Sequence, residues 1–287
     1  MLFNRRQIVS ATAASVGVLA MTRPATAMTV ASKMRFGLVT YLWGKDMPLP
    51  ELIKNCEAAG VLGVELRTEH KHGVEPNLSE AERADVMKRF ADSPVELVGY
   101  GSNCEFHSED RQELRRQIEQ AKKYVQLMHD CGGSGVKVKP NGFPQGAPRE
   151  RTIEQIGKSL NEVAEYAQGY GQKIRVEVHG AGTSELPVMR DIFRVADHPN
   201  VGVCWNSNDV DLEGAGLEAN FEMVKDRFGD TVHVRELNDE SYPYAKLMNM
   251  LTAIDYAGWV LLEARTDPLD KVAAMREQRK IFEELTQ

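Results

Sequence analysis

The run KIRVEVHG (173–180) decides the fold of this chain together with three others, NVGVCWN (200–206), TVHVREL (231–237) and GWVLLEAR (258–265). Each run is short and contains apolar residues at alternating or consecutive positions, and a stretch long enough for a helix separates it from the next. A polar side chain lies at or near the end of each run, and successive ones are 29, 27 and 30 residues apart: Glu177, Asn206, His233 and Glu263. Because the strand ends of a parallel barrel open into one shared mouth, we expect these four side chains to face one another.

The same alternation of β-rich runs and amphipathic stretches begins at residue 36. It predicts strands at 36–41, 63–67, 95–101, 135–140, 173–179, 201–206, 231–237 and 259–265. It predicts helices at 48–60, 79–90, 109–131, 150–168, 184–196, 217–228, 243–256 and 267–285. Eight strand-helix repeats favour a closed barrel over an open sheet, and 287 residues with 42% hydrophobic content suit one such domain. We therefore predict a single (β/α)8 TIM barrel.

The first 27 residues differ from the rest of the chain. Arg5 and Arg6 precede an apolar run of small residues, and an A-x-A signal ends at Ala27, so residues 1–27 are predicted to be an export signal. The paired arginines favour the twin-arginine route, with an ordinary secretory signal as the alternative. The apolar run is too short for a membrane anchor. We expect residues 28–287 to form an exported protein, periplasmic or secreted.

Charge and cysteine content exclude several classes of protein. The formal charge is −7, and residues 1–27 contain three arginines and no acid, so residues 28–287 carry −10. Nucleic acids and anionic membranes bind clustered lysines and arginines, so neither is an expected partner. The four cysteines lack the short paired spacing of a zinc finger, and we expect free buried thiols, with one disulfide as the alternative: Cys56, Cys104, Cys131 and Cys204.

The motifs RVEVHG, VCWNSND, VHVREL and LLEAR resemble the ligand positions of the xylose isomerase-like TIM-barrel family, which includes sugar phosphate isomerases/epimerases and ketose epimerases. That family carries Glu, Asp, His and Glu on its fifth to eighth strands as ligands of one divalent metal. The resemblance covers essentially all of residues 28–287, and GVEL with Glu65 adds to it. It implies that one metal is held by Glu177, Asn206, His233 and Glu263. Mn²⁺ is the expected ion, with Co²⁺, Mg²⁺ and Zn²⁺ as alternatives.

Asn206 departs from the family pattern, which has Asp in a D-x-x-H motif where this chain reads NSND (206–209). An amide oxygen can ligate a hard cation but contributes no charge. We therefore expect weaker metal binding or a preference for a different ion. Asp209 and Asp211 are alternative ligands.

The resemblance implies proton transfer next to a carbonyl. A metal that chelates a carbonyl and an adjacent hydroxyl acidifies the C–H between them and stabilises the resulting enediolate. By analogy with the epimerases, Glu177 and Glu263 exchange the proton on opposite faces of the substrate, while His233 and Asn206 hold the metal.

Other side chains near the strand ends are candidates for contacting a sugar. Three of them follow a predicted ligand by two residues and so share its face: His179, Arg235 and Arg265. Lys137 and Lys139 likewise share one face of the fourth strand, and Lys139 is expected to reach the mouth. The remaining candidates are Glu65, His107 and Trp43. A purely structural role is the alternative for each.

The leading hypothesis is an exported, metal-dependent isomerase or epimerase of a sugar or keto-sugar. A lyase or hydratase acting on 3-keto-glycosides is the first alternative, because it begins with the same proton abstraction. A sugar-binding barrel without metal is the second. A DNA-repair endonuclease of the same fold fits less well, because the acidic chain lacks a phosphate-binding stripe. The resemblance is also compatible with a homo-oligomer.

Overall fold

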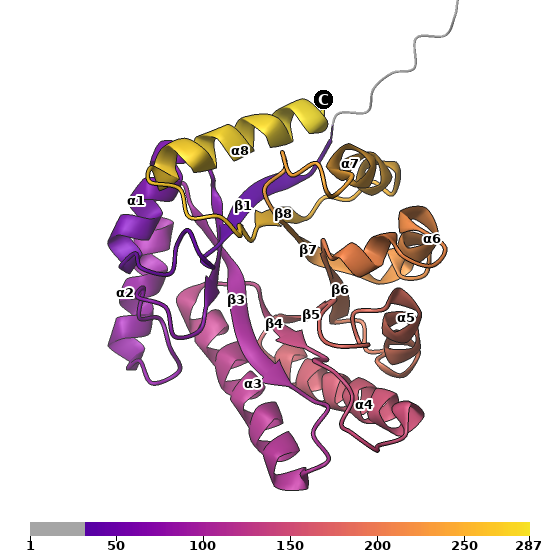
Figure 1. Ribbon diagram of the computed structural model, residues 1–287. Helices are drawn as coiled ribbons and strands as arrows, with labels where there is room; N and C mark the ends of the chain where they lie inside the picture. Colours follow the sequence, from indigo (N-terminus) through magenta and orange to yellow (C-terminus); the bar gives the residue numbers. More distant parts are fainter. Residues whose placement is uncertain (1–31) are drawn as a thin grey trace, which may run out of the picture. The chain divides into compact units, whose positions relative to one another are not determined.

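Residues 32–287 are described by a computed structural model and contain a closed barrel of eight parallel strands (Figure 1). The strands follow one another around the barrel in chain order, and β8 pairs with β1. Their bounds are β1 (Arg35–Val39), β2 (Gly63–Arg67), β3 (Glu96–Glu105), β4 (Gly135–Lys139), β5 (Lys173–Glu177), β6 (Val201–Asn206), β7 (Phe228–Val234) and β8 (Trp259–Leu262). The predicted (β/α)8 barrel is confirmed. The expected export signal, residues 1–27, lies outside the described residues.

Helices surround the strands on the outside of the barrel (Figure 1). Their bounds are α1 (Leu49–Ala59), α2 (Glu80–Ala91), α3 (Arg111–Cys131), α4 (Arg149–Gln168), α5 (Leu186–Val195), α6 (Leu217–Glu222), α7 (Tyr244–Ala253) and α8 (Lys271–Leu285). Two short 3-10 turns, η1 (Asp209–Leu212) and η2 (Lys225–Arg227), flank α6.

Local sequence signals set several helix ends. Ser79 precedes α2 in a capping box, in which its Oγ accepts from the backbone N–H of Glu82 and the Glu82 carboxylate accepts from the N–H of Ser79. The Asp110 carboxylate caps α3 by accepting from the N–H of Gln112. At the other end of α3, Gly132 has a φ of 84°, a left-handed conformation that glycine adopts without strain.

Large side chains fill the amino-terminal part of the barrel interior opposite glycines on other strands. A Cβ on Gly63 would come within 2.4 Å of the Trp259 ring, so the indole occupies the space that Gly63 leaves. A Cβ on Gly99 would come within 2.1 Å of the Arg175 guanidinium, which forms an ion pair with Asp230 at 2.8 Å. This end of the barrel is therefore packed and charge-paired, and a polar site is left to the carboxyl-terminal end.

The segment 217–228 is not the single helix that the sequence predicted. Only α6 is helical, η2 follows it, and β7 begins at Phe228. Within this segment, the Arg227 guanidinium donates to the backbone carbonyls of Phe193, Ala196 and Val201. These acceptors lie outside the segment, so its own sequence does not reveal the contact. A smaller difference is that β3 extends four residues beyond its predicted end at 101, to Glu105.

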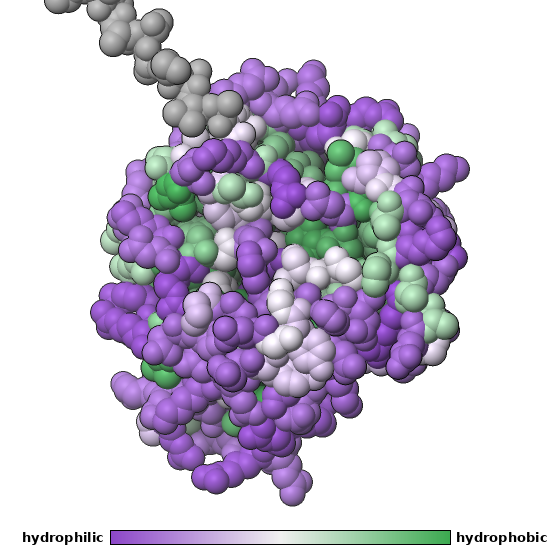
Figure 2. All heavy atoms as spheres, turned by 180° about the vertical axis from the view of Figure 1, so that it is seen from behind, coloured by the Kyte–Doolittle hydropathy of each residue, from purple (hydrophilic) through white to green (hydrophobic). Residues whose placement is uncertain are grey.

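The four cysteines are free and buried, as expected. None of the helices within residues 32–287 combines the length and apolar character that crossing a bilayer requires. On the face drawn in Figure 2, hydrophobic areas are small and lie between hydrophilic ones.

Candidate metal centre

Side chains from β5, β7 and the end of β8 converge at the carboxyl-terminal mouth of the barrel. One carboxylate oxygen each of Glu177 and Glu263 and one ring nitrogen of His233 lie within 4.8 Å of one another. Glu177 is 1% exposed and His233 is 0% exposed, while the Glu263 side chain keeps 13%. The structure thus brings together three of the four predicted ligands.

Strand alternation places these groups inside the barrel. Residues two apart on a strand share a face, so Glu177 points inward as Arg175 does, one layer nearer the mouth. In the register of β6 and β7, Asn206 pairs with His233, which sets the fourth predicted ligand beside the cluster.

Asn206 contacts the cluster through its amide nitrogen, which donates to Oε1 of Glu177 at 3.0 Å. The two alternative ligands lie elsewhere. Asp209 has an 80% exposed side chain and pairs with Arg235 at 3.1 Å. Asp211 is buried and accepts from a tyrosine hydroxyl and a backbone N–H, and burial raises its pKa to about 7. Neither aspartate belongs to the group of converging ligands.

Glu65 on β2 lies on the other side of His233. Its Oε1 is 3.2 Å from Nε2 of His233, and Nδ1 of the same ring is 3.7 Å from Oε2 of Glu263. We expected Glu65 to contact a substrate, but its side chain is completely buried and faces the imidazole instead. Burial opposes ionisation of Glu65, yet the neighbouring His233 and Lys137 lower its pKa below the ordinary value. A carboxylate in this place orients a ligating histidine.

The donor set fits a divalent cation. Two carboxylates and an imidazole are ligands that Mn²⁺, Co²⁺ and Zn²⁺ accept. Among residues 32–287, the buried ring nitrogens of His233 have no hydrogen-bond partner of good geometry. Buried polar atoms rarely lack a partner. Since Nδ1 faces Glu263, a cation held by the cluster would satisfy it.

Two positively charged side chains pair with the carboxylates of the cluster. Lys137 on β4 forms a completely buried ion pair with Glu177. Burial alone would raise the pKa of Glu177, but Lys137 and then His233 lower it below the ordinary value. Arg67, at the end of β2, pairs with Oε1 of Glu263 at 2.8 Å. Our sequence reasoning missed Arg67, although its position two residues after Glu65 was the available signal.

Lys139 and His179 also reach the mouth, each beside an asparagine that sequence reasoning missed. Nζ of Lys139 lies 3.3 Å from Oδ1 of Asn103, which sits in the unpredicted extension of β3. Nδ1 of His179 lies 2.8 Å from Oδ1 of Asn141, in the loop after β4. Burial lowers the pKa of both Lys139 and His179.

The other predicted substrate contacts lie farther out. Trp43, Arg235 and Arg265 line a separate hollow of about 400 Å³ beyond the ends of β7 and β8. Trp43 is only 2% exposed, and its indole N–H donates to the carbonyl of Thr266 at 3.0 Å, so most of its ring is covered. Arg265 is exposed. His107 follows β3 and has a buried Nδ1 without a partner among the described residues.

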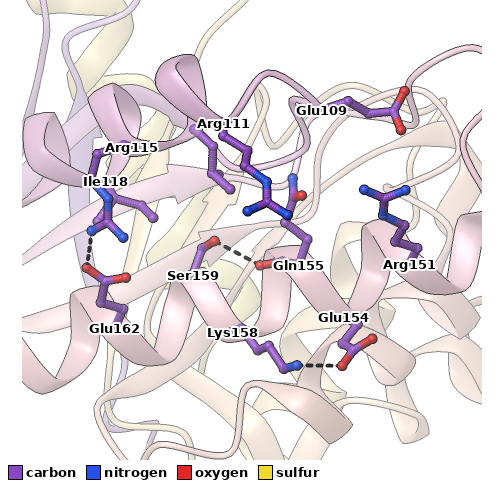
Figure 3. A pocket seen from close by; sticks show the side chains of 11 residues that line it. Glu109, Arg111, Arg115, Ile118, Arg151, Glu154, Gln155, Lys158, Ser159 and Glu162 are labelled. Carbon is purple, nitrogen blue, oxygen red and sulfur yellow. Dashed lines mark hydrogen bonds and ion pairs between the residues drawn. The ribbon is translucent and has the colours of Figure 1, made fainter.

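A larger groove, of about 520 Å³, lies outside the barrel between α3 and α4 (Figure 3). Four of its charged side chains pair with one another, Arg115 with Glu162 and Lys158 with Glu154. The groove shares no residue with the strand-end cluster. Size alone therefore does not single out the candidate site, which is chosen on the convergence of Glu177, His233 and Glu263.

Comparisons with known proteins agree on the fold. The family model described as xylose isomerase-like TIM barrel matches residues 53–285. No curated protein sequence matches the chain. Among solved structures, L-ribulose 3-epimerase has a TM-score of 0.76 at 18% identity, covering 88% of this chain and 94% of its own. The 3-keto-D-glucoside 4-epimerase from E. coli has a TM-score of 0.72 at 14% identity, covering 86% and 98%. The IolI protein with a bound zinc atom has a TM-score of 0.70 at 18% identity, covering 88% and 98%.

At these identities, the solved structures establish a shared fold. The family match extends over most of the chain, and it includes all four strand-end positions from Glu177 to Glu263. This chain belongs to the xylose isomerase-like TIM-barrel family.

Proposed function

We propose that the protein is a divalent-metal-dependent isomerase or epimerase of a sugar or keto-sugar. The observation that carries the proposal is the convergence of Glu177, His233 and Glu263 within 4.8 Å at the mouth of the barrel. Glu177, His233 and Glu263 would hold the cation, with Asn206 beside them. When bound, the cation would polarise a substrate carbonyl and make the neighbouring C–H more acidic.

The two carboxylates suit a proton exchange. They reach the same point from β5 and from the end of β8, so a substrate lying between them would present opposite faces to each. Lys137 and Arg67 stabilise the ionised forms of Glu177 and Glu263. Each carboxylate is therefore ready to accept a proton from carbon. Glu263 is the more accessible of the two, with 13% of its side chain exposed.

His233 has a positioning role in this proposal. The carboxylate of Glu65 lies at Nε2, which leaves Nδ1 directed at the cation site. The packed residues Trp259 and Arg175 below the cluster keep water from entering through the other end of the barrel.

The names of several proteins with this fold support the choice of reaction. L-ribulose 3-epimerase and D-allulose 3-epimerase from Methylomonas sp. are sugar epimerases, and the latter was solved in complex with D-allulose. The IolI protein was solved with a zinc atom, which supports a metal in this chain without identifying the ion. We propose Mn²⁺, with Co²⁺, Mg²⁺ and Zn²⁺ as alternatives.

Metal content of the purified protein tests the proposal. Elemental mass spectrometry of the wild type should find about one divalent ion per chain, after incubation with excess Mn²⁺ where needed. His233→Ala and Glu263→Ala should each lose it. His129→Ala is the matched control, since His129 is an exposed histidine on α3 and should leave the metal in place. A wild type that binds no metal would remove the catalytic proposal and favour the sugar-binding barrel.

Proton exchange separates the isomerase from the lyase. An isomerase or epimerase should transfer solvent deuterium to the carbon next to the carbonyl of a keto-sugar and return an intact sugar. A lyase would begin with the same exchange but release the group at the β position of a 3-keto-glycoside. The fold shared with a 3-keto-D-glucoside 4-epimerase supports including such substrates in the screen.

We further propose that the protein is exported and that residues 1–27 are removed. The motif with Arg5 and Arg6 supports the twin-arginine route. Amino-terminal sequencing of the exported form should begin at Met28, and replacing both arginines by lysine should leave the protein unprocessed. Export of the lysine variant would favour the ordinary secretory route.

A further inference from the structure

Lys139 is the positively charged side chain at the mouth that contacts a neutral group, whereas Lys137 and Arg67 each contact a carboxylate. Lys137 pairs with Glu177, and Arg67 pairs with Glu263. Nζ of Lys139 instead lies 3.3 Å from the neutral amide oxygen of Asn103, and no carboxylate of residues 32–287 forms an ion pair with it. Lys139 is half-buried, and a partly desolvated ammonium without a counter-ion is energetically unfavourable. The site therefore contains a cation that a ligand could neutralise.

The sum of the charges around the mouth also favours a negatively charged ligand. The hydrogen bonds and ion pairs that connect the cluster to its neighbours join three carboxylates and three cations: Glu65, Glu177, Glu263, Arg67, Lys137 and Lys139. With neutral histidines these six charges cancel, so a divalent cation would give the site a net charge of +2. Asn206 contributes to this excess, because an aspartate at that position would add a negative charge and reduce the net charge of the site to +1. A site with a net positive charge favours an anionic substrate.

Asn103 marks where the anionic group would lie. Its Oδ1 is 3.3 Å from Nζ of Lys139 and also 3.3 Å from Nη2 of Arg67. The amide oxygen thus occupies a point between two cations. Asn103 is exposed, so a stronger acceptor could displace it.

We propose that the substrate is a sugar acid, whose carboxylate binds between Lys139 and Arg67. This inference rests on the proposed function and names the substrate class for the same site. The carboxylate offsets one positive charge. Transfer of the proton from carbon to a glutamate leaves the total charge unchanged, so one positive charge remains to stabilise the enediolate as it forms. A phosphate dianion would already cancel the excess before the reaction, so it fits this charge arrangement less well.

Binding measurements on the full chain test the assignment. Isothermal titration calorimetry would compare 2-keto-D-gluconate and 5-keto-D-gluconate with neutral D-fructose and with D-fructose 6-phosphate, with and without Mn²⁺. At least one keto acid should bind more tightly than D-fructose by roughly tenfold or more. Lys139→Met should weaken keto-acid binding roughly tenfold to hundredfold and change D-fructose binding by less than about twofold.

Lys158→Met is the matched control, because it removes the same charge from an exposed position on α4. It should leave every dissociation constant unchanged. Three results would overturn the assignment: equal affinity for keto acids and D-fructose in the wild type, an equal loss for both ligands in Lys139→Met, or tightest binding of the sugar phosphate.

The outcomes also separate this inference from the proposed function. A protein that holds metal and exchanges the α-proton of a neutral keto-sugar, but shows no preference for keto acids, keeps the function and rejects the acidic substrate. A protein without metal that still binds keto acids through Lys139 keeps the anion site and rejects the metal-dependent reaction.

Discussion

Nε2 of His233 lies 3.2 Å from Oε1 of Glu65, and both side chains are completely buried. The contact joins β2 to β7 across the barrel interior. With Nε2 toward Glu65, Nδ1 of the same ring faces Glu263, 3.7 Å from its Oε2. A residue from the first half of the chain thus lies against a candidate ligand from the second half.

We predict that Glu65→Gln weakens metal binding roughly tenfold to hundredfold, because outer carboxylates orient ligating histidines. Direct titration with Mn²⁺ measures the effect. Glu96→Gln is the control, since Glu96 is exposed at the start of β3 and pairs with Arg35. Equal affinity in Glu65→Gln and the wild type would show that Glu65 has no part in orienting His233.

The effects of replacing Lys137 and Glu177 on the free energy of unfolding are predicted to be strongly non-additive. Removing either charge leaves the other buried and unpaired, which typically costs about 3–5 kcal/mol. Lys137→Met and Glu177→Gln should each lower the free energy of unfolding of the metal-free protein by about this amount. The double variant should lose clearly less than the sum. Urea unfolding of the four proteins gives the coupling energy, and additive losses would contradict the pairing.

The ion pair between Asp230 and Arg175 predicts a specific pH dependence. Burial alone would raise the pKa of Asp230, but Arg175 and Lys173 lower it to about 2. A carboxyl whose pKa is lower in the folded state stabilises the protein above its unfolded pKa of about 3.9. That stability is lost as the pH falls through about 2.

Asp230→Asn should therefore be less stable than the wild type by about 3 kcal/mol at pH 6, and the gap should shrink between pH 4 and pH 2. Urea unfolding across this pH range checks it. Asp226→Asn, an exposed position in the turn just before β7, should show little difference at any pH. A gap that stays constant down to pH 2 would contradict the ion-pair account.

Close packing of α4 on α5 predicts the effect of Gly157→Ala. A Cβ at this position would lie 2.5 Å from the Cβ of Val195, so the two helices would have to separate. We expect a loss of about 1–3 kcal/mol, despite alanine's higher helix propensity. Gly169→Ala is the control, because its nearest non-bonded atom would be 3.4 Å away and its φ is −62°. Thermal unfolding should show a lower Tm for Gly157→Ala alone.

Periodicity in the sequence was sufficient to predict the barrel. The alternation of strands with helices of period 3.6 is a local property, and so are the capping box at Ser79 and the glycine at 132 that ends α3. The strand-end positions of Glu177, His233 and Glu263 follow from the same pattern, because a closed parallel barrel brings strand ends together. The prediction of one helix at 217–228 was wrong at its end, where Arg227 donates to backbone carbonyls in another part of the chain.

The sequence was enough to predict the fold, the order of the strands and the convergence of Glu177, His233 and Glu263. The surroundings of these three side chains became known only from the folded chain: Glu65 faces His233, Lys137 and Arg67 pair with the two carboxylates, and Lys139 lies beside an amide. The reason is physical. Local backbone preferences and burial patterns depend on neighbours in sequence, whereas the charge partner of a buried side chain depends on strands that meet only when the barrel closes.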